Sequence, residues 1–275
     1  MTLATLKEEI VRKQSFLCVG LDVDLEKVPV AFQTSPTALV DFSKAIIDAT
    51  ADYAVAYKPN IAFFETYGVE GMSALKEVID YLNVHYPRHF TIADAKRGDI
   101  GNTSTRYAKA YFDTLGFDSI TVAPYMGKDS VEPFLAFDEK YTILLALTSN
   151  PGAADFQRLQ SNGQPLFKNV LETSKSWEGS ERLMYVVGAT RAEALQEIRA
   201  IVPDAFLLVP GVGAQGGSLE EVARNGLTKD IGLLVNSSRG IIYASQGEDF
   251  AEAAAQAAHS LQKEMAVLLK EKNLS

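Results

Sequence analysis

Cysteine is almost absent from this chain, since Cys18 is the only one among 275 residues. A single thiol cannot form an internal disulfide, and it leaves a metal site built from cysteines without support. Histidine is also scarce. His85, His89 and His259 fall within or at the ends of expected helices, and no pair has the spacing of metal ligands. We therefore expect a buried Cys18, surface histidines and no bound metal.

Long apolar runs and an excess of positive charge are missing as well. No segment approaches the roughly 20 apolar residues of a membrane span, and the start, MTLATLKEEIVRK, has acids where a signal peptide would be apolar. The net charge is −9, with a pI near 5.0. Proteins that bind nucleic acid usually carry a basic patch. We expect a cytoplasmic protein that binds neither membrane nor nucleic acid.

Eight short apolar runs are present, and stretches with helical spacing lie between them. The runs are SFLCVGLD from Ser15, YAVAYKPN from Tyr53, FTIADAKR from Phe90, SITVAPYM from Ser119, TILLALTS from Thr142, LMYVVGAT from Leu183, AFLLVPGVG from Ala205 and GLLVNSSRG from Gly232. Continuously apolar strands are typical of a parallel sheet covered on both faces. The pattern predicts an α/β protein formed by a single (β/α)8 TIM barrel over residues 1–275, with an open doubly wound sheet as the alternative.

Polar residues cluster where these runs end, and in such a barrel the active site lies at the carboxyl ends of the strands. The candidates are Asp22, Asp24, Lys58, Asn60, Asp94, Lys96, Asp99, Thr148, Ser149, Asn150, Gly211, Gly213, Gln215, Asn236, Ser237, Ser238 and Arg239. The irregular stretch from Asn150, NPGAADFQRLQSNGQP, is either a lid or a mobile surface insertion.

The third run ends in DAKRGD, which places charges of both signs close together. Strand alternation directs Asp94 and Lys96 to one face, where the carboxylate would keep the lysine protonated. An ammonium in this position suits protonation of a carbanion, although a structural ion pair is the alternative. Lys58 extends the set to an alternating array of Lys58, Asp94, Lys96 and Asp99, in which each charge is paired.

The last two runs indicate an anion site. Glycines in VPGVGAQGGS allow backbone N–H groups to approach a ligand, and GGS leads into a helical stretch. Gln215 and Arg239 supply an amide and a guanidinium, so the pattern favours phosphate over a plain turn. Neither a Gly-x-Ser-x-Gly motif nor a full dinucleotide fingerprint is present, which gives acyl-enzyme and nicotinamide chemistry little support.

DAKRGD, with a strand-end lysine upstream, resembles the Asp-x-Lys-x-x-Asp motif of the orotidine 5′-phosphate decarboxylase family. Further segments from about Ser15 to Ala244 are similar to the strand ends of that family: CVGLDVD, AYKPNIAFFE, LALTSNPG, VPGVGAQGG and VNSSRGIIYA. The segment AYKPNIAFFE, the TSNPG turn and the overall length look most like the longer bacterial, type 2 branch.

The resemblance implies conversion of orotidine monophosphate to uridine monophosphate and CO2 in de novo pyrimidine biosynthesis, with no metal and no cofactor. It implies that Lys96 is the proton donor to C6, that Asp94 lies beside the substrate carboxylate and that Lys58 orients Asp94. It further implies a homodimer in which Asp99, Ile100 and Thr103 serve the neighbouring site. The implied substrate contacts are Asp22 for the ribose, Ser149 for the pyrimidine, and Gln215, Arg239 and Gly240 for the phosphate.

Two alternatives stay open from the sequence. Sister barrels such as hexulose-phosphate synthase share the DxKxxD motif and carry out Mg2+-dependent chemistry on sugar phosphates, but we expect them to carry an acidic residue at the position of Lys58. A non-catalytic barrel that binds a nucleotide would keep the phosphate site without needing the charged array.

Overall fold

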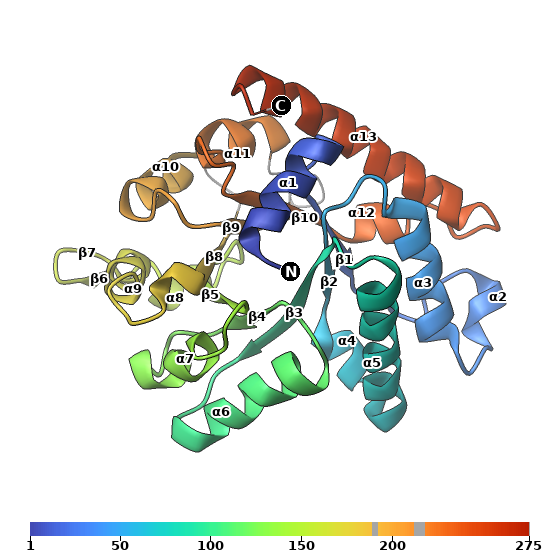
Figure 1. Ribbon diagram of the computed structural model, residues 1–275, viewed down its shortest axis with the longest axis horizontal. Helices are drawn as coiled ribbons and strands as arrows, with labels where there is room; N and C mark the ends of the chain where they lie inside the picture. The colour runs from blue at the N-terminus through green and yellow to red at the C-terminus, as the bar shows by residue number, and fades with distance from the viewer. Residues whose placement is uncertain (189–191, 212–217, 275) are drawn as a thin grey trace.

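A computed structural model describes residues 1–188, 192–211 and 218–274 of the chain. Eight parallel strands close into a barrel in the order β1-β10-β9-β8-β5-β4-β3-β2, with helices around the outside (Figure 1). The strands are β1 (Leu17–Leu21), β2 (Ala56–Pro59), β3 (Phe90–Arg97), β4 (Ser119–Val122), β5 (Tyr141–Leu147), β8 (Leu183–Val187), β9 (Leu207–Pro210) and β10 (Leu233–Ser237). Because β1 pairs with both β2 and β10, the predicted barrel is confirmed and the open sheet is wrong.

All eight apolar runs form strands of this barrel, and their side chains are buried along almost the whole length. Burial on both faces explains why the runs do not alternate between apolar and polar residues. Cys18 lies on β1 and is completely buried, as predicted.

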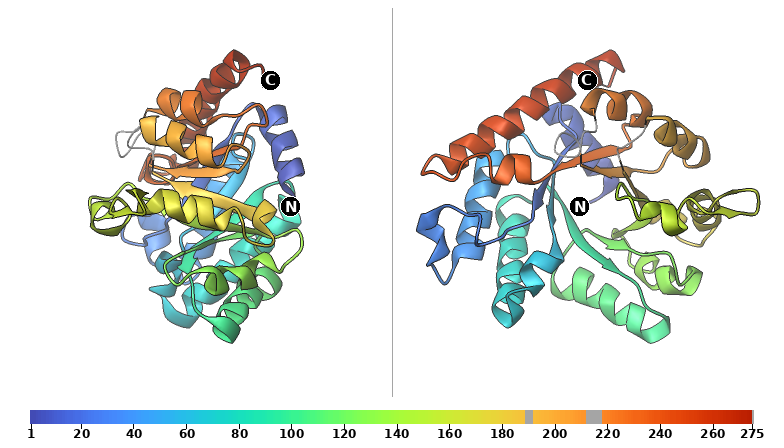
Figure 2. Two further views of the ribbon diagram at one scale, coloured as in Figure 1. Left: turned by 90° about the vertical axis from the view of Figure 1, so that its left-hand side faces the viewer. Right: turned by 180° about the vertical axis from the view of Figure 1, so that it is seen from behind.

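The helices form a ring that Figure 2 shows from the side and from behind. The longer ones are α1 (Leu3–Lys13), α3 (Ala38–Thr50), α5 (Gly68–His85), α6 (Gly101–Lys109), α7 (Lys128–Leu135), α9 (Leu166–Ser174), α10 (Ala192–Ile201), α11 (Leu219–Gly226) and α13 (Phe250–Glu271). Short helices α2 (Val30–Gln33), α4 (Ile61–Glu65) and α12 (Arg239–Ile242) lie in the connections, and α6 continues as a π-helical turn, Ala110–Thr114. Among the described residues, no helix has both the length and the apolar character needed to cross a membrane.

Helix α1 covers the amino end of the barrel (Figure 1). Leu6 and Ile10 are fully buried beneath it, and the N–H of Leu3 donates to the hydroxyl of Tyr141 at 3.1 Å. The terminal amino group of Met1 also forms an ion pair with Asp118, just before β4. The strand-end candidates lie at the opposite, carboxyl end of the barrel.

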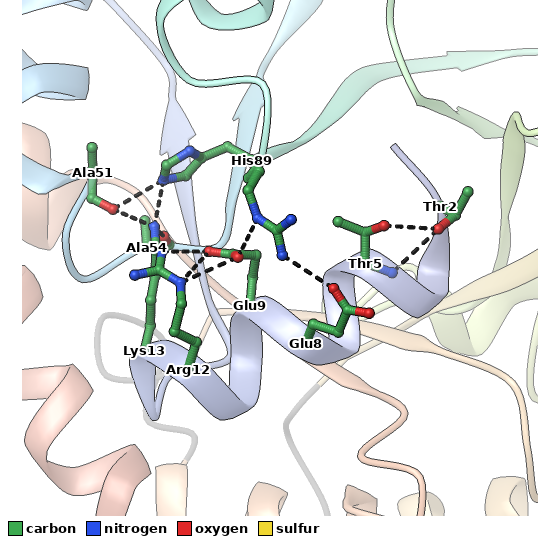
Figure 3. Close-up of polar contacts among 10 residues, drawn as sticks. Thr2, Thr5, Glu8, Glu9, Arg12, Lys13, Ala51, Ala54 and His89 are labelled. Carbon is green, nitrogen blue, oxygen red and sulfur yellow. Dashed lines mark hydrogen bonds and ion pairs between the residues drawn. The ribbon is translucent and has the colours of Figure 1, made fainter.

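A polar cluster joins the end of α1 to the start of β3 (Figure 3). The ammonium of Lys13 donates to Ala51 O at 2.5 Å and Ala54 O at 2.8 Å, and lies 2.7 Å from Nε2 of His89. Burial lowers the pKa of Lys13 to about 8, and burial followed by the Lys13 charge lowers the pKa of His89 to about 4. The expectation that all three histidines lie on the surface is wrong for His89, which is 8% exposed because α1 covers it.

The stretch from Asn150 is more ordered than its sequence suggests. It contains helix α8 (Ala153–Phe156) and a two-stranded hairpin of β6 (Gln160–Ser161) and β7 (Gln164–Pro165). Oε1 of Gln157 accepts from the N–H of Thr148 at 2.7 Å, which ties this insertion to the end of β5. That the insertion acts as a lid stays a prediction, with a surface insertion as the alternative.

Candidate active site

A cavity of about 170 Å³ opens at the carboxyl end of the barrel. Its lining comes from loops and strand ends of both halves of the chain: Asp22, Lys58, Asn60, Asp94, Pro210, Gly211, Asn236, Ser237, Ser238 and Arg239. Nine of these ten residues are strand-end candidates from the sequence, which shows that the barrel brings those strand ends to one place. The tenth is Pro210, the last residue of β9.

Gly211 directly follows β9 and lines the cavity. Asn60 follows β2 and forms an isolated parallel bridge with Asp94.

The carboxylate of Asp94 is the centre of the charged group. Its Oδ2 lies 2.7 Å from Nζ of Lys58 and its Oδ1 lies 2.5 Å from Nζ of Lys96. The hydroxyl of Thr121 lies 3.1 Å from Oδ1 as well. Thr121 is not among the sequence candidates, because it lies inside the apolar run SITV and only the pairing of β3 with β4 brings it to Asp94.

The ionisation of this group follows from opposing effects of burial and charge. Burial alone would raise the pKa of Asp94, but the ammonium groups of Lys58 and Lys96 outweigh it and lower the pKa to about 2. Burial would likewise lower the pKa of Lys58, yet the charges of Asp94 and Asp22 raise it above its ordinary value. Asp94 and Lys58 are therefore both charged at neutral pH.

Lys96 and Asp94 meet, as expected, but not through regular alternation. The backbone of Lys96 has a φ of +48°, in the left-handed region that residues with a side chain seldom adopt. The pairing of β3 with β4 is irregular between Ala93 and Arg97. The prediction that the two side chains share a face is confirmed by their contact, whereas the strand geometry assumed for it is wrong.

Two buried acceptors in the cavity have no hydrogen-bond partner among the described residues: Oδ1 of Asp22 and Oδ1 of Asn236. Buried polar atoms are usually paired, so unpaired ones in a cavity indicate a place for a ligand's donors. Asp22 was predicted to contact a ligand. Asn236 had been noted only as a strand end, and its burial within β10 could not be read from the sequence.

The expected phosphate contacts are only partly described. Arg239 begins α12, is exposed and lines the cavity, and Gly240 follows it. Among the described residues Arg239 has no ion-pair partner. Gln215 and Gly213 lie outside the described residues.

Asp99 does not join the other three charges within this chain, so the array of four is incomplete. Its carboxylate accepts from the N–H of Ile100 at 2.7 Å, and no described residue forms an ion pair with it. Ile100 and Thr103 are exposed at the start of α6. Ser149 follows β5, and its backbone packs so closely on Gly188 that a Cβ there would lie 2.7 Å from its nitrogen.

The described residues offer little support for metal-dependent chemistry or for a cysteine nucleophile. In the described parts of the chain, no three His, Cys, Asp or Glu side chains are grouped so that they could hold a metal ion. Burial raises the pKa of the Cys18 thiol to about 12, which keeps it from acting as a nucleophile.

Comparison with known proteins identifies the family of this chain. The profile of the orotidine 5′-phosphate decarboxylase / HUMPS family matches residues 15–256. The orotidine 5′-phosphate decarboxylase of Christiangramia forsetii is 65% identical over 266 residues, which cover 97% of this chain and 98% of the relative.

Two solved structures of this family match the chain to different extents. The structure of Leishmania donovani OMP decarboxylase is 37% identical, with a TM-score of 0.81, and the match covers 97% of this chain and 99% of that one. The orotidine 5′-monophosphate decarboxylase of Methanocaldococcus jannaschii is 27% identical, with a TM-score of 0.65 and 89% of this chain covered. The fuller match to the Leishmania donovani enzyme agrees with the longer, type 2 branch expected from the sequence. This chain belongs to the orotidine 5′-phosphate decarboxylase family.

Proposed function

We propose that this chain converts orotidine 5′-monophosphate to uridine 5′-monophosphate and CO2 in de novo pyrimidine biosynthesis. The observation that carries the proposal is the Asp94 carboxylate held between the ammonium groups of Lys58 and Lys96 at the carboxyl end of the barrel. The decarboxylase of Christiangramia forsetii, 65% identical to this chain, supports it. We also propose that residues 1–275 act as one domain in the cytoplasm, as expected from the sequence.

The geometry suits the chemistry of this reaction. Loss of CO2 from an sp2 ring carbon leaves a carbanion with no adjacent electron sink, so the enzyme must stabilise charge that develops near the transition state. A preorganised ammonium does this, and Lys96 is the group we assign to it and to the protonation of C6. Asp94 lies beside the departing carboxylate, where its negative charge raises the energy of the bound substrate relative to the transition state.

The remaining residues bind the substrate. Lys58 orients Asp94, and the unpaired Oδ1 of Asp22 accepts from a ribose hydroxyl. We assign Ser149 to the pyrimidine edge, and Gln215, Arg239 and Gly240 to the phosphate. Binding the phosphate far from the reacting carbon supplies energy for orientation, which affects kcat as well as KM. No metal or cofactor has a role in this proposal.

The proposal includes a homodimer. Large apolar side chains are exposed after β3, β4 and β5: Ile100, Tyr125, Met126, Phe156 and Leu159. An apolar cavity of about 480 Å³ lies in the same region, lined in part by Tyr125 and Phe156. Exposed apolar surface of this kind marks an interface. A second copy bound there would bring its Asp99, Ile100 and Thr103 to the active site of the first.

The test is the absorbance change when purified protein is added to orotidine 5′-monophosphate in the presence of EDTA. We expect turnover by the wild type, and a loss of at least about 100-fold in Lys96→Ala, because the proton donor is removed. Lys76→Ala is the matched control, since Lys76 is a half-buried lysine on α5, away from the cavity, that pairs with Asp80. Turnover of sugar phosphates only, and only with Mg2+, would instead show a sister-barrel enzyme.

A further inference from the structure

The pairing between β3 and β4 is interrupted next to the charged group. Ala93 pairs with Ile120 and Arg97 pairs with Val122, so three residues of β3, Asp94 to Lys96, lie opposite the single residue Thr121 of β4. A bulge of this kind removes ladder hydrogen bonds and leaves backbone groups that need other partners.

Thr121 supplies the missing partner. Its side chain is 1% exposed, and its hydroxyl oxygen accepts from the N–H of Lys96 at 2.9 Å. The same hydroxyl lies 3.1 Å from Oδ1 of Asp94 and 3.4 Å from the carbonyl of Ala93. Its one proton goes to the carboxylate, since that acceptor is nearer and charged.

One buried hydroxyl therefore contacts both halves of the charged pair. It holds the backbone of Lys96, whose φ of +48° is unfavourable for a residue with a side chain. It also fixes Oδ1 of Asp94, the oxygen that Lys96 Nζ approaches to 2.5 Å. Lys58 holds only the other oxygen, Oδ2. Without the Thr121 hydroxyl, the Lys96 N–H and Oδ1 of Asp94 lose the one side chain that contacts both of them.

We propose that Thr121 is a positioning residue, which sets the backbone of Lys96 and the carboxylate of Asp94 for the reaction. This inference rests on the proposed function of that pair. Thr121 is not among the residues that line the cavity, so its loss should disturb the transition state more than the binding of the nucleotide.

The variants Thr121→Val and Thr121→Ser separate positioning from packing. Valine keeps the shape and removes the hydroxyl, whereas serine keeps the hydroxyl and loses a methyl group. Thr142→Val is the matched control: Thr142 is fully buried on the neighbouring strand β5, and within the described parts of the chain its hydroxyl has no hydrogen-bond partner.

We expect Thr121→Val to lower kcat by about 100-fold, with KM and the Kd for uridine monophosphate within about threefold of wild type. Thr121→Ser should recover most of kcat, and Thr142→Val should keep it. Equal kcat in Thr121→Val and wild type would overturn the proposal, as would a loss that serine does not recover or a loss expressed in KM alone.

Amide hydrogen exchange at Lys96 tests the geometry without turnover. We expect the Lys96 N–H to exchange slowly in wild type and Thr121→Ser, and faster in Thr121→Val. Equal protection in all three proteins would overturn the inference even if the enzyme is active. If the wild type does not decarboxylate orotidine monophosphate, the proposed function fails, and the exchange result still shows whether Thr121 holds Lys96.

Discussion

A mostly buried carboxylate stays ionised in this barrel because ammonium groups lie on two sides of it. Asp94 contacts Lys58 through one oxygen and Lys96 through the other, and these charges lower its pKa to about 2. Removing either lysine would leave charge buried without its full complement of partners, which is costly.

At the residue scale, we predict that Arg239→Ala loses several kcal/mol of transition-state stabilisation, or about 100-fold or more in kcat/KM. The reason is that the guanidinium of Arg239 lines the cavity and is available to clamp a phosphate. Steady-state kinetics with orotidine monophosphate measure the effect.

Arg224→Ala provides the control for Arg239, because Arg224 is an exposed arginine on α11 that pairs with Glu220. Its kcat/KM should match that of the wild type. If kcat/KM were unchanged in Arg239→Ala, Arg239 would have no part in the site.

At the scale of single elements, α1 accounts for a buried group that the sequence did not reveal. The helix covers the amino end of the barrel, and its last residue, Lys13, contacts His89 and two carbonyls (Figure 3). Glu9 on the same helix is fully buried and accepts from Arg12 and Arg88. Protonating His89 would place a second cation beside Lys13, so the neutral imidazole is favoured.

This arrangement predicts a dependence of stability on pH. The pKa of His89 is about 4 in the folded protein and 6.5 as its ordinary value, so the unfolded chain binds more protons between these values. The contribution of His89 to the free energy of unfolding should therefore be lost as pH falls from about 6.5 to 4, by at most about 3 kcal/mol.

Urea unfolding of wild type and His89→Gln between pH 4 and 7 checks this. Glutamine does not titrate, so the difference in stability between the two proteins should shrink, or change sign in favour of the variant, as pH falls. His85→Gln, at an exposed position on α5, is the matched control for removing a histidine. Parallel pH curves for wild type and His89→Gln would contradict the prediction.

At the scale of the whole molecule, closure of the barrel brings together side chains from Asp22 to Arg239. One chain leaves Asp99 outside the charged group, with apolar residues exposed around it. Both features are consistent with a site that is completed by a second copy.

The dimer proposal predicts complementation between two inactive variants. In a mixed dimer of Lys96→Ala and Asp99→Ala subunits, one of the two sites receives an intact Lys96 and an intact Asp99. Random exchange of subunits should therefore restore about a quarter of the wild-type activity. The measurement is turnover after the two proteins are mixed, with each variant alone as the control. No recovery, although subunit exchange is demonstrated, would place Asp99 in its own subunit's site or outside any site.

The sequence by itself determined the number of barrel strands, their order along the chain and the residues at their carboxyl ends. Eight continuously apolar runs became the eight barrel strands, because burial on both faces demands such runs. Lys58, Asp94 and Asp22 could also be predicted, because the carboxyl ends of all the strands lie at the same end of the barrel. These are local patterns, and they require no knowledge of which strands are neighbours.

Only the tertiary structure decided which groups touch. Lys58 and Asp94 are 36 positions apart, and Thr121 and Asp94 are 27 apart, so their contacts depend on the register of separate strands. The left-handed backbone of Lys96 and the burial of His89 under α1 likewise come from packing between distant segments. Strand spacing indicated that charges would gather at one end of the barrel, but the geometry of their contacts was fixed when the barrel closed, because each contact joins residues that are remote in sequence.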